Sequence, residues 1–290
     1  MNEHKEVIEI NGVEFSYDTE KAYEKDGHVY CKTCNEQIDG KEIELPFRKT
    51  KFIFNKECKC DRERRDREEK EQRAYEVEKL KDRCFYYDKP LKTASLDEID
   101  GKEESTIVQA KAYVETFDQM FSDNIGILLS GPVGTGKSYI AAAIANGIME
   151  KYQYSVKFRS IPQIIRDMQK NGLNSDQNQY LSDVCSAKLI IFDDLGIERK
   201  TEYVTELLYS IINERHRKNM PTIITTNIPI SEFRSENIPT EFQRVYSRIL
   251  SMCNINITVN GRDRRKDEDI EKTKKAMKTI KEYMKTQEGK

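Results

Sequence analysis

The architecture can be read from one glycine-rich stretch, Gly131-Pro132-Val133-Gly134-Thr135-Gly136-Lys137-Ser138. It fits the phosphate-binding pattern G-x-x-x-x-G-K-[ST], and an apolar run at 125–130 precedes it as a strand would. In that setting the backbone N–H groups of the turn point at a phosphate, and the next helix adds its positive dipole end. We therefore expect a nucleotide site with Lys137 at the β- and γ-phosphates and Ser138 as a Mg²⁺ ligand. A merely flexible loop would not require the Lys-Ser pair or the flanking strand and helix.

Two further apolar runs end in polar residues. Residues 189–192 are apolar and lead into Asp193 and Asp194, as a buried parallel strand does at the carboxyl end where ligands bind. We expect Asp193 to hold Mg²⁺ through water and Asp194 to orient or deprotonate the attacking water. The run 222–226 ends in Asn227, which either positions the water near the γ-phosphate or caps the strand end.

The segments around these runs alternate between helical and strand patterns. The spacing predicts helices over 105–121, 139–149 and 161–168, a strand over 154–158, and a polar loop over 171–177. Such alternation predicts an α/β fold, a parallel sheet flanked by helices, for a nucleotide domain spanning 91–265.

The first 60 residues contain two close cysteine pairs among short predicted strands and turns. Cys31 and Cys34 form a C-x-x-C pair, and Cys58 and Cys60 form a C-x-C pair, which is tighter than usual. Two such pairs can present four thiolates to Zn²⁺, so residues 1–60 are predicted to be a small zinc-binding module. Free thiols, a redox pair or another metal remain alternatives. His28 is a further candidate ligand, although a surface histidine is the simpler interpretation.

The segments 61–90 and 266–290 are rich in charge. In the first, opposite charges recur three or four residues apart without glycine, which predicts a solvated helical linker that Pro90 ends. Apolar residues return only past Tyr75, where the helix is expected to dock on the main domain. The C-terminal segment is either a solvated tail or an amphipathic helix that contacts DNA or a partner.

Composition limits the function classes. Of 290 residues 34% are charged, yet the formal net charge is −2, so any nucleic-acid surface must be local. The sequence has no apolar run of membrane-spanning length and does not begin like a signal peptide. We therefore expect no membrane association, a cytoplasmic location and reduced cysteines.

Taken together, these motifs match a family. The glycine-rich loop (Walker A), the strand ending at Asp193-Asp194 (Walker B), a sensor-1-like Thr226-Asn227 and the segment 244–248 resemble AAA+ ATPases of the DnaC/DnaI helicase-loader and IstB group. The resemblance covers about residues 90–265. A cysteine-pair module ahead of a charged linker is similar to loaders of the DnaI type and their phage-encoded relatives.

The resemblance assigns roles to several arginines. It implies that Arg248 is the arginine finger that acts on the nucleotide of the neighbouring subunit, with Arg244 in support. The segment 261–265 resembles the family's G-x-D-x-R pattern, which implies that Arg265 is sensor 2. This sequence departs from the pattern, since Arg264 replaces the usual aromatic and Arg262 competes for the role. Surface salt bridges are the structural alternative for all of them.

The function implied by the resemblance is an ATPase that loads a replicative hexameric helicase onto single-stranded DNA. ATP would join adjacent subunits of a homo-oligomer, and the zinc module would grip the helicase. One alternative is an IstB-like transposition helper that acts on duplex DNA. Another is a non-catalytic adaptor, against which the intact Asp193-Asp194 pair argues.

Overall fold

The computed structural model describes residues 4–44, 51–99, 104–170, 175–196, 202–235, 237–261 and 263–288. The chain divides into two compact units, Met1–Tyr75 and Glu76–Lys290. The boundary falls within α1 (Lys59–Cys84), the helix that contains most of the predicted linker. The finer boundaries at residues 60, 90 and 265 stay predictions.

The first unit is built from antiparallel hairpins. β1 (Lys5–Ile10) pairs with β2 (Val13–Asp18), β3 (Ala22–Lys25) with β4 (His28–Cys31), and β5 (Asp39–Glu44) with β6 (Lys51–Asn55). Two of the turns are Asn11-Gly12, with φ angles of 53° and 80°, and Asp26-Gly27, with φ angles of 53° and 76°. Positive φ at both central residues is typical of the tight hairpin turns whose backbone twist matches the twist of the paired strands. The core is small and consists of Ile10, Phe15, Tyr17, Ala22 and Val29.

Charged side chains of helix α1 pair with one another along its exposed surface. Arg64 lies 2.7 Å from Asp61, and Arg65 lies 3.7 Å from Glu69, one helical turn away. Such exposed pairs each contribute only a few tenths of a kcal/mol. At its C-terminal end, Cys84 is buried in the second unit's core, as expected for a helix that docks past Tyr75.

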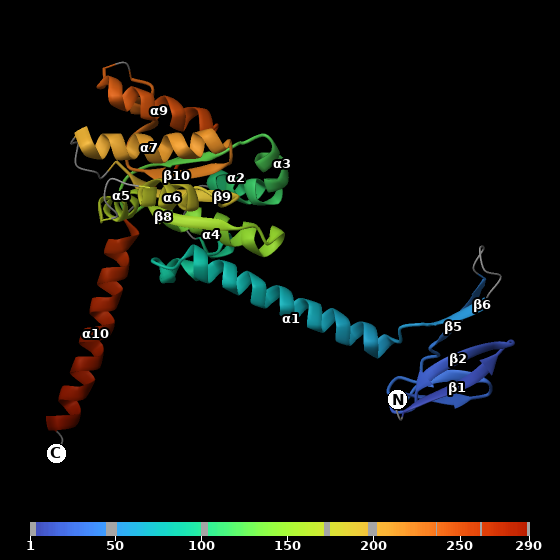
Figure 1. Cartoon of the computed structure of the whole chain (residues 1–290). Coiled ribbons are helices and arrows are strands. Elements are labelled where there is room, and N and C mark those ends of the chain that lie inside the picture. Colours follow the sequence, from blue (N-terminus) through green and yellow to red (C-terminus); the bar gives the residue numbers. More distant parts are fainter. Residues whose placement is uncertain are drawn as a thin grey trace. The chain divides into compact units, whose positions relative to one another are not determined.

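The second unit contains a five-stranded parallel sheet among the described residues (Figure 1). Its strands are β7 (Ile127–Ser130), β8 (Val156–Ser160), β9 (Leu189–Leu195), β10 (Thr222–Thr226) and β11 (Ile255–Thr258). Their order is β11-β7-β10-β9-β8, so the strands that carry the glycine-rich loop and the paired carboxylates flank β10. The predicted α/β fold with a helix-flanked parallel sheet is confirmed.

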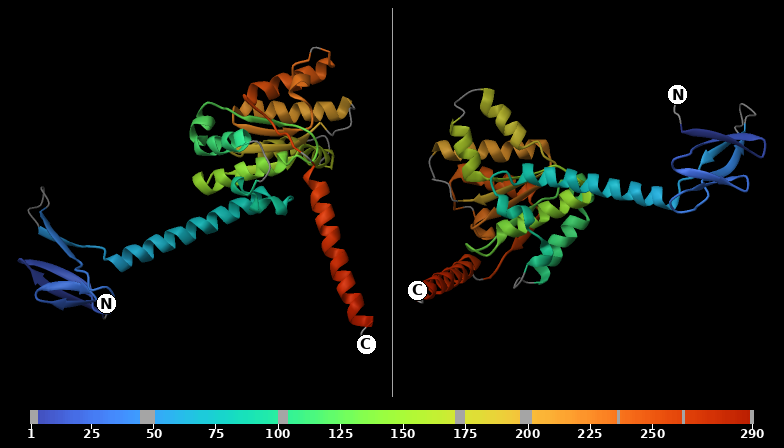
Figure 2. Two further views of the ribbon diagram at one scale, coloured as in Figure 1. Left: turned by 180° about the vertical axis from the view of Figure 1, so that it is seen from behind. Right: turned by 90° about the horizontal axis from the view of Figure 1, so that it is seen from below.

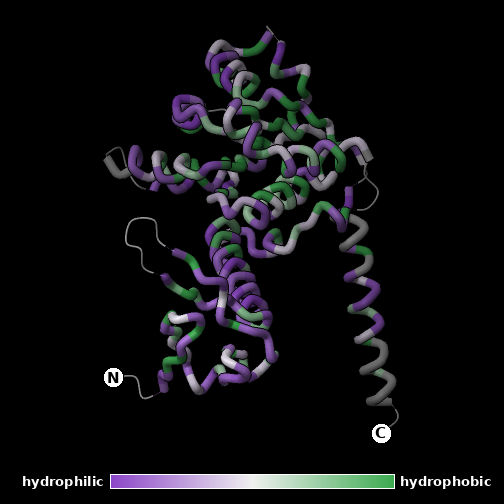
Figure 3. Tube along the Cα trace, turned by 90° about the vertical axis from the view of Figure 1, so that its right-hand side faces the viewer, coloured by the Kyte–Doolittle hydropathy of each residue, from purple (hydrophilic) through white to green (hydrophobic). Residues whose placement is uncertain are grey.

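Helices cover both faces of this sheet (Figure 2). One face packs on α2 (Glu104–Glu115) and α4 (Lys137–Tyr152). The other face packs on α5 (Ile161–Lys170), α6 (Ser175–Val184), α7 (Glu202–Lys218) and α9 (Thr240–Met252). Because successive strand residues point to opposite faces, the inner strands β7, β9 and β10 are buried almost throughout, whereas the edge strands β8 and β11 also carry polar residues. Figure 3 shows hydrophobic residues concentrated within these layers.

The remaining elements are short, apart from the last. They are the 3₁₀ turns η1 (Lys89–Thr93) and η2 (Leu96–Glu98), the helices α3 (Phe117–Ser122) and α8 (Ile230–Phe233), and the long helix α10 (Arg264–Glu288). Helix α10 exposes an apolar row at helical spacing, made up of Ile270, Met277, Ile280 and Met284. The C-terminal segment is therefore an amphipathic helix over those residues.

Two local expectations are wrong. The helix expected over 105–121 is two helices, because the backbone leaves helical geometry at Thr116, where φ is −108°. The Thr116 hydroxyl donates to the Ala112 carbonyl at 2.8 Å, an alternative partner that loosens the helical ladder. In the predicted loop 171–177, residues 171–174 lie outside the described part, and Ser175 begins helix α6.

The fully buried Arg215 side chain connects the amino ends of β9 and β10 through hydrogen bonds. Its guanidinium donates from Nε to the Thr222 hydroxyl, and from its terminal nitrogens to the carbonyls of Cys185, Ala187, Lys188 and Pro221. All five N–H donors of the side chain are thus used. Burial lowers the pKa of Arg215 to about 10, which leaves it charged at neutral pH. Sequence reasoning did not find this arginine.

Candidate functional site

The glycine-rich loop has the backbone geometry of a phosphate cradle. Gly131, Gly134 and Gly136 have φ angles of 149°, 76° and 89°, a region that disfavours other residues. A Cβ on Gly131 would lie 2.3 Å from the Val259 carbonyl oxygen, so the loop also needs glycine for space. Helix α4 begins directly after Gly136, and its N-terminal N–H groups therefore face the loop.

Lys137 is buried and bonded within the loop. Its Nζ donates to the carbonyls of Gly131 and Pro132, both at 2.8 Å, and to Asn227 Oδ1 at 2.7 Å. The structure thus brings together Lys137 and Asn227, which are 90 residues apart in sequence. The Thr135 hydroxyl donates to the Pro132 carbonyl at 2.9 Å and so stabilises the same turn.

The paired carboxylates lie at the end of β9. Burial raises the pKa of Asp193 to about 6, in spite of hydrogen bonds from the hydroxyls of Thr225, at 2.5 Å, and Ser138. The contact between Ser138 and Asp193 unites the two residues predicted to hold Mg²⁺. An oxygen-rich pair of this kind suits a hard cation, whose charge would favour the ionised carboxylate.

Asp194 differs from Asp193 in both exposure and backbone. It is partly exposed, with φ of 56°, and its N–H donates to the Thr225 hydroxyl at 3.0 Å. Left-handed geometry is uncommon for a non-glycine residue, although Asp tolerates it better than most, and here it occurs where the chain turns beside the glycine-rich loop. This turn aims Asp194 into the pocket beside the glycine-rich loop.

That pocket has a volume of about 490 Å³. Its polar lining consists of Glu98, Lys137, Ser138, Asp194, Asn227 and Arg264, and its apolar lining includes Leu91, Ile99, Val133, Tyr139 and Ile140. A polar end beside an apolar wall is what a nucleotide requires for its phosphates and its base.

Arg264 was missed as a site residue. It lines the pocket, and its backbone N–H donates to the Gly134 carbonyl at 3.0 Å, while Asp263 abuts Gly134 so closely that a Cβ there would lie 1.8 Å from its Oδ1. The signal was present, because Arg264 stands where the family pattern has an aromatic. Arg262 lies outside the described residues, and so does the side chain of Arg265, whose predicted role stays a prediction.

Arg248 lies on α9, away from this subunit's pocket lining. Its guanidinium contacts Tyr209 and Asn213 of α7, and its Nη1 donates to the Arg244 carbonyl at 3.2 Å. Arg244 itself is exposed. The predicted arginine-finger role of Arg248 stays a prediction.

The four N-terminal cysteines form one cluster. The Sγ atoms of Cys31, Cys34, Cys58 and Cys60 all lie within 4.8 Å of one another. Cys60 Sγ lies 3.1, 3.4 and 3.6 Å from those of Cys58, Cys31 and Cys34, whereas a tetrahedral zinc site with Zn–S bonds of 2.3 Å separates sulfurs by about 3.8 Å. Backbone N–H groups of Cys34 and Thr33 lower the pKa of the Cys31 thiol to about 6. Four cysteine thiols gathered within 4.8 Å of one another fit the donor set of a structural zinc site, in which the sulfurs would lie slightly farther apart.

His28 is not part of that cluster. Its Nδ1 lies 2.7 Å from Asp39 Oδ2, and Asp39 also accepts from the Val29 N–H at 2.7 Å and the Gln37 amide at 2.9 Å. Burial raises the pKa of the Asp39 carboxyl, but these hydrogen bonds outweigh it, and the pKa lies below its ordinary value. Asp39 thus ties β4 to β5.

We expect Asp39→Asn to destabilise the first unit by about 2 kcal/mol at pH 7, since it removes charge-assisted hydrogen bonds. A carboxyl whose pKa is lowered by folding stabilises above its unfolded value and stops doing so as the pH falls through the folded value. The difference between wild type and variant should therefore begin to shrink below pH ~4 and vanish only once the pH is below the lowered pKa of folded Asp39. Denaturant unfolding of both proteins at several pH values measures it, and a constant difference would contradict the assignment.

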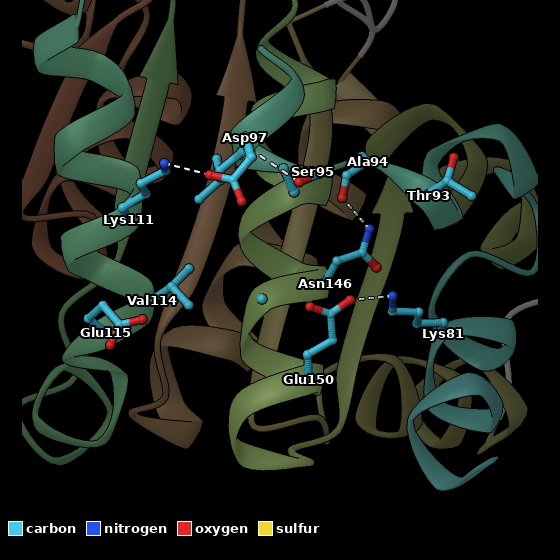
Figure 4. Close-up of a pocket in the computed structure, with 13 residues that line it drawn as sticks. Lys81, Thr93, Ala94, Ser95, Asp97, Lys111, Val114, Glu115, Asn146 and Glu150 are labelled. Atoms are coloured by element: carbon cyan, nitrogen blue, oxygen red, sulfur yellow. Dashed lines mark hydrogen bonds and ion pairs between the residues drawn. The ribbon is translucent and has the colours of Figure 1, made fainter. Parts of the chain in front are cut away.

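A second pocket, of about 370 Å³, is lined by the segment 93–97 and by residues of α2 and α4 (Figure 4). Asn146 donates to the carbonyls of Leu91 and Ala94 at 3.2 and 2.8 Å. Lys81 pairs with Glu150 at 2.6 Å at its rim. These contacts fix the segment whose residues Leu91 and Ile99 line the nucleotide pocket.

No helix in the described part of the chain is long and apolar enough to cross a membrane.

The relatives found by comparison with known proteins include two replicative helicase loaders. The chain is 25% identical to the replicative helicase loader DnaI of Bacillus subtilis (strain 168) over 285 residues, which cover 91% of this chain and 88% of that protein. It is 28% identical to the replicative helicase loader DnaC of Escherichia coli (strain K12) over 130 residues, 44% of this chain and 51% of that protein. A crystal structure of the DnaC helicase loader matches with 25% identity and a TM-score of 0.50, covering 59% of this chain and 99% of that chain.

The second unit therefore has the AAA+ P-loop fold. The sequence profile of the family described as IstB-like ATP binding protein matches residues 59–271, well over half of the chain. This range includes the glycine-rich loop and the strand that ends in Asp193 and Asp194. The chain belongs to the family of IstB-like ATP-binding proteins.

Proposed function

We propose that this protein is an ATPase that loads a hexameric replicative helicase onto single-stranded DNA. The observation that carries the proposal is the similarity to the loader DnaI, which extends over 91% of this chain and includes the cysteine module as well as the ATPase domain. The arrangement of Lys137, Asp194 and Asn227 around one pocket, with Asp193 buried beside it, supports ATP hydrolysis as the energy source.

The polar residues of the phosphate cradle and the predicted arginines have the following roles in the proposed reaction. On ATP binding, Lys137 leaves the loop carbonyls and binds the β- and γ-phosphate oxygens, while the loop N–H groups bind the phosphates. Ser138 and Asp193 would hold Mg²⁺, which neutralises the charge that develops on the phosphates. Asp194 accepts a proton from the attacking water or orients it, and Asn227, released by Lys137, positions that water. Arg248 of the adjacent subunit, and Arg265 as sensor 2, stabilise the phosphate charge.

The N-terminal residues 1–60 would serve as the helicase-binding module. Cys31, Cys34, Cys58 and Cys60 would hold Zn²⁺ and so connect the turn after β4 with the start of α1. We assign 61–90 to the linker, 91–265 to the ATPase domain and 266–290 to a C-terminal helix. Subunits would assemble through ATP into a homo-oligomer in the cytoplasm, with a local basic groove for the DNA backbone.

The transposition-helper alternative is less well supported. DnaI, which matches over most of both chains, is a helicase loader, whereas the family model is described as IstB-like ATP binding protein. A preference for duplex DNA and the lack of a helicase partner would favour that alternative. Measurable ATP turnover would exclude a purely structural adaptor.

The test is ATP hydrolysis and co-migration with a hexameric replicative helicase, with and without single-stranded DNA. We expect the full-length protein to co-migrate with the helicase, and Cys31→Ser protein to lose that association while it keeps its nucleotide pocket. Single-stranded DNA should change the hydrolysis rate. Stimulation by duplex DNA without helicase association would overturn the loader proposal and leave the ATP site as described.

A further inference from the structure

Arg248 is fixed by two side chains of the neighbouring helix α7. Its Nε donates to Asn213 Oδ1 at 3.2 Å, and its Nη2 donates to the Tyr209 hydroxyl at 2.9 Å. The guanidinium carbon also lies 4.7 Å from the centre of the Tyr209 ring, within the range of a cation–π contact. Tyr209 and Asn213 are four residues apart and so lie on one face of α7.

These contacts leave part of the guanidinium available. Of the five N–H groups of an arginine, the contacts to Asn213, Tyr209 and the Arg244 carbonyl use three. The other two are one on each terminal nitrogen, the pair that binds a phosphate in a two-pronged manner. Arg215 provides a contrast within the same domain, since it is buried and uses all five N–H groups on its own subunit.

The packing of the two helices does not depend on Arg248. Helices α7 and α9 contact each other through buried apolar residues, among them Leu208, Ile211, Val245 and Ile249. Arg248, Tyr209 and Asn213 are only partly buried at the rim of this interface. Removing their polar contacts should therefore leave the helix pair folded.

We propose that Tyr209 and Asn213 are positioning residues that hold the Arg248 guanidinium with its two remaining N–H groups directed at a phosphate of the neighbouring subunit's ATP. The inference deepens the proposed function and rests on it. Because the side chain is already ordered before the subunits meet, less of its conformational freedom is lost when the phosphate binds. Loss of this order misplaces the charge, and misplacement by about 1 Å can reduce a rate by about 100-fold.

The experiment uses mixed full-length subunits. An acceptor subunit carries Arg248→Ala, so it binds ATP but offers no arginine, and a donor subunit carries Asp194→Asn, so it offers Arg248 but does not hydrolyse its own ATP. Hydrolysis in the mixture then reports on the donor's Arg248 acting on the acceptor's ATP. We expect Tyr209→Phe with Asn213→Ala in the donor to lower the mixed rate at least tenfold.

The same two substitutions in the acceptor provide the control for folding. Arg248 is already absent there, so the mixed rate should stay within twofold. Asn213→Asp in the donor retains an acceptor oxygen for Nε and should restore most of the rate, and Tyr203→Phe, on the same helix, is the matched tyrosine control. Equal losses from donor and acceptor, or no loss from the donor, would overturn the inference. If a donor that also lacks Arg248 remained fully active, the trans-acting arginine of the proposed function would itself be wrong.

Discussion

Replacing Lys137 with alanine should lower ATP hydrolysis by on the order of a thousandfold and weaken ATP binding at the same time. The residue is buried beside the glycine-rich loop, and its ammonium lies within hydrogen-bond distance of the loop carbonyls. Because it bonds the carbonyls of Gly131 and Pro132, its removal also leaves two loop acceptors without that donor. Steady-state hydrolysis and titration with a labelled ATP analogue measure the two effects.

Lys151→Ala provides the matched control for Lys137→Ala. Lys151 lies near the end of the same helix, α4, and pairs with Glu115 at 2.5 Å, far from the glycine-rich loop in sequence. Its removal should leave both hydrolysis and ATP binding nearly unchanged. Substantial turnover by Lys137→Ala protein would show that phosphate charge is neutralised by another group.

Removing zinc should unfold the first unit while the second stays folded. Metal binding supplies on the order of 10 kcal/mol in zinc-finger peptides, which exceeds what the small core around Phe15 and Val29 can provide. The second unit has its own extensive core on both faces of the sheet and so should withstand chelation. Limited proteolysis after chelation should degrade the N-terminal residues and spare the ATPase domain.

Metal analysis and a cysteine variant complete the zinc test. Wild-type protein should contain one Zn²⁺ per chain, Cys31→Ser protein much less, and a chelator should not change the variant's proteolysis further. Returning Zn²⁺ to chelated wild-type protein should restore resistance. Proteolysis that chelation does not alter would argue for free thiols at the cluster.

The phosphate-facing part of the site could be predicted because its residues are constrained along the sequence. A loop that wraps a phosphate fixes the spacing from Gly131 to Ser138, and strands buried on both faces remain apolar until residues such as Asp193 emerge. The strands that precede these residues pair in parallel, so their carboxyl ends lie at the same edge of the sheet. The sequence pattern therefore predicted the strands of the site and the edge at which they end.

The residues that sequence reasoning missed are defined by tertiary contacts. Arg215 reaches carbonyls of two other segments, and Tyr209 meets Arg248 from a different helix. Neither pairing has a signature of spacing, because each depends on how separate elements pack. Thr116 is similar on a smaller scale, since its hydroxyl competes with a backbone bond that the apolar periodicity does not report.

The bonds of Lys137 have a consequence for product release. An ammonium has three N–H groups, and the loop carbonyls of Gly131 and Pro132 together with Asn227 match that number. A phosphate that binds Lys137 must therefore replace hydrogen-bond acceptors that the protein itself supplies. The net binding free energy from Lys137 is then the difference between the two sets of hydrogen bonds. In the proposed complex ATP would also contact the wall that includes Leu91 and Ile99, whereas free inorganic phosphate is too small to do so. If the protein hydrolyses ATP as proposed, the loop carbonyls and Asn227 would compete with the cleaved phosphate for Lys137, which would favour departure of the phosphate and make the pocket ready for the next ATP.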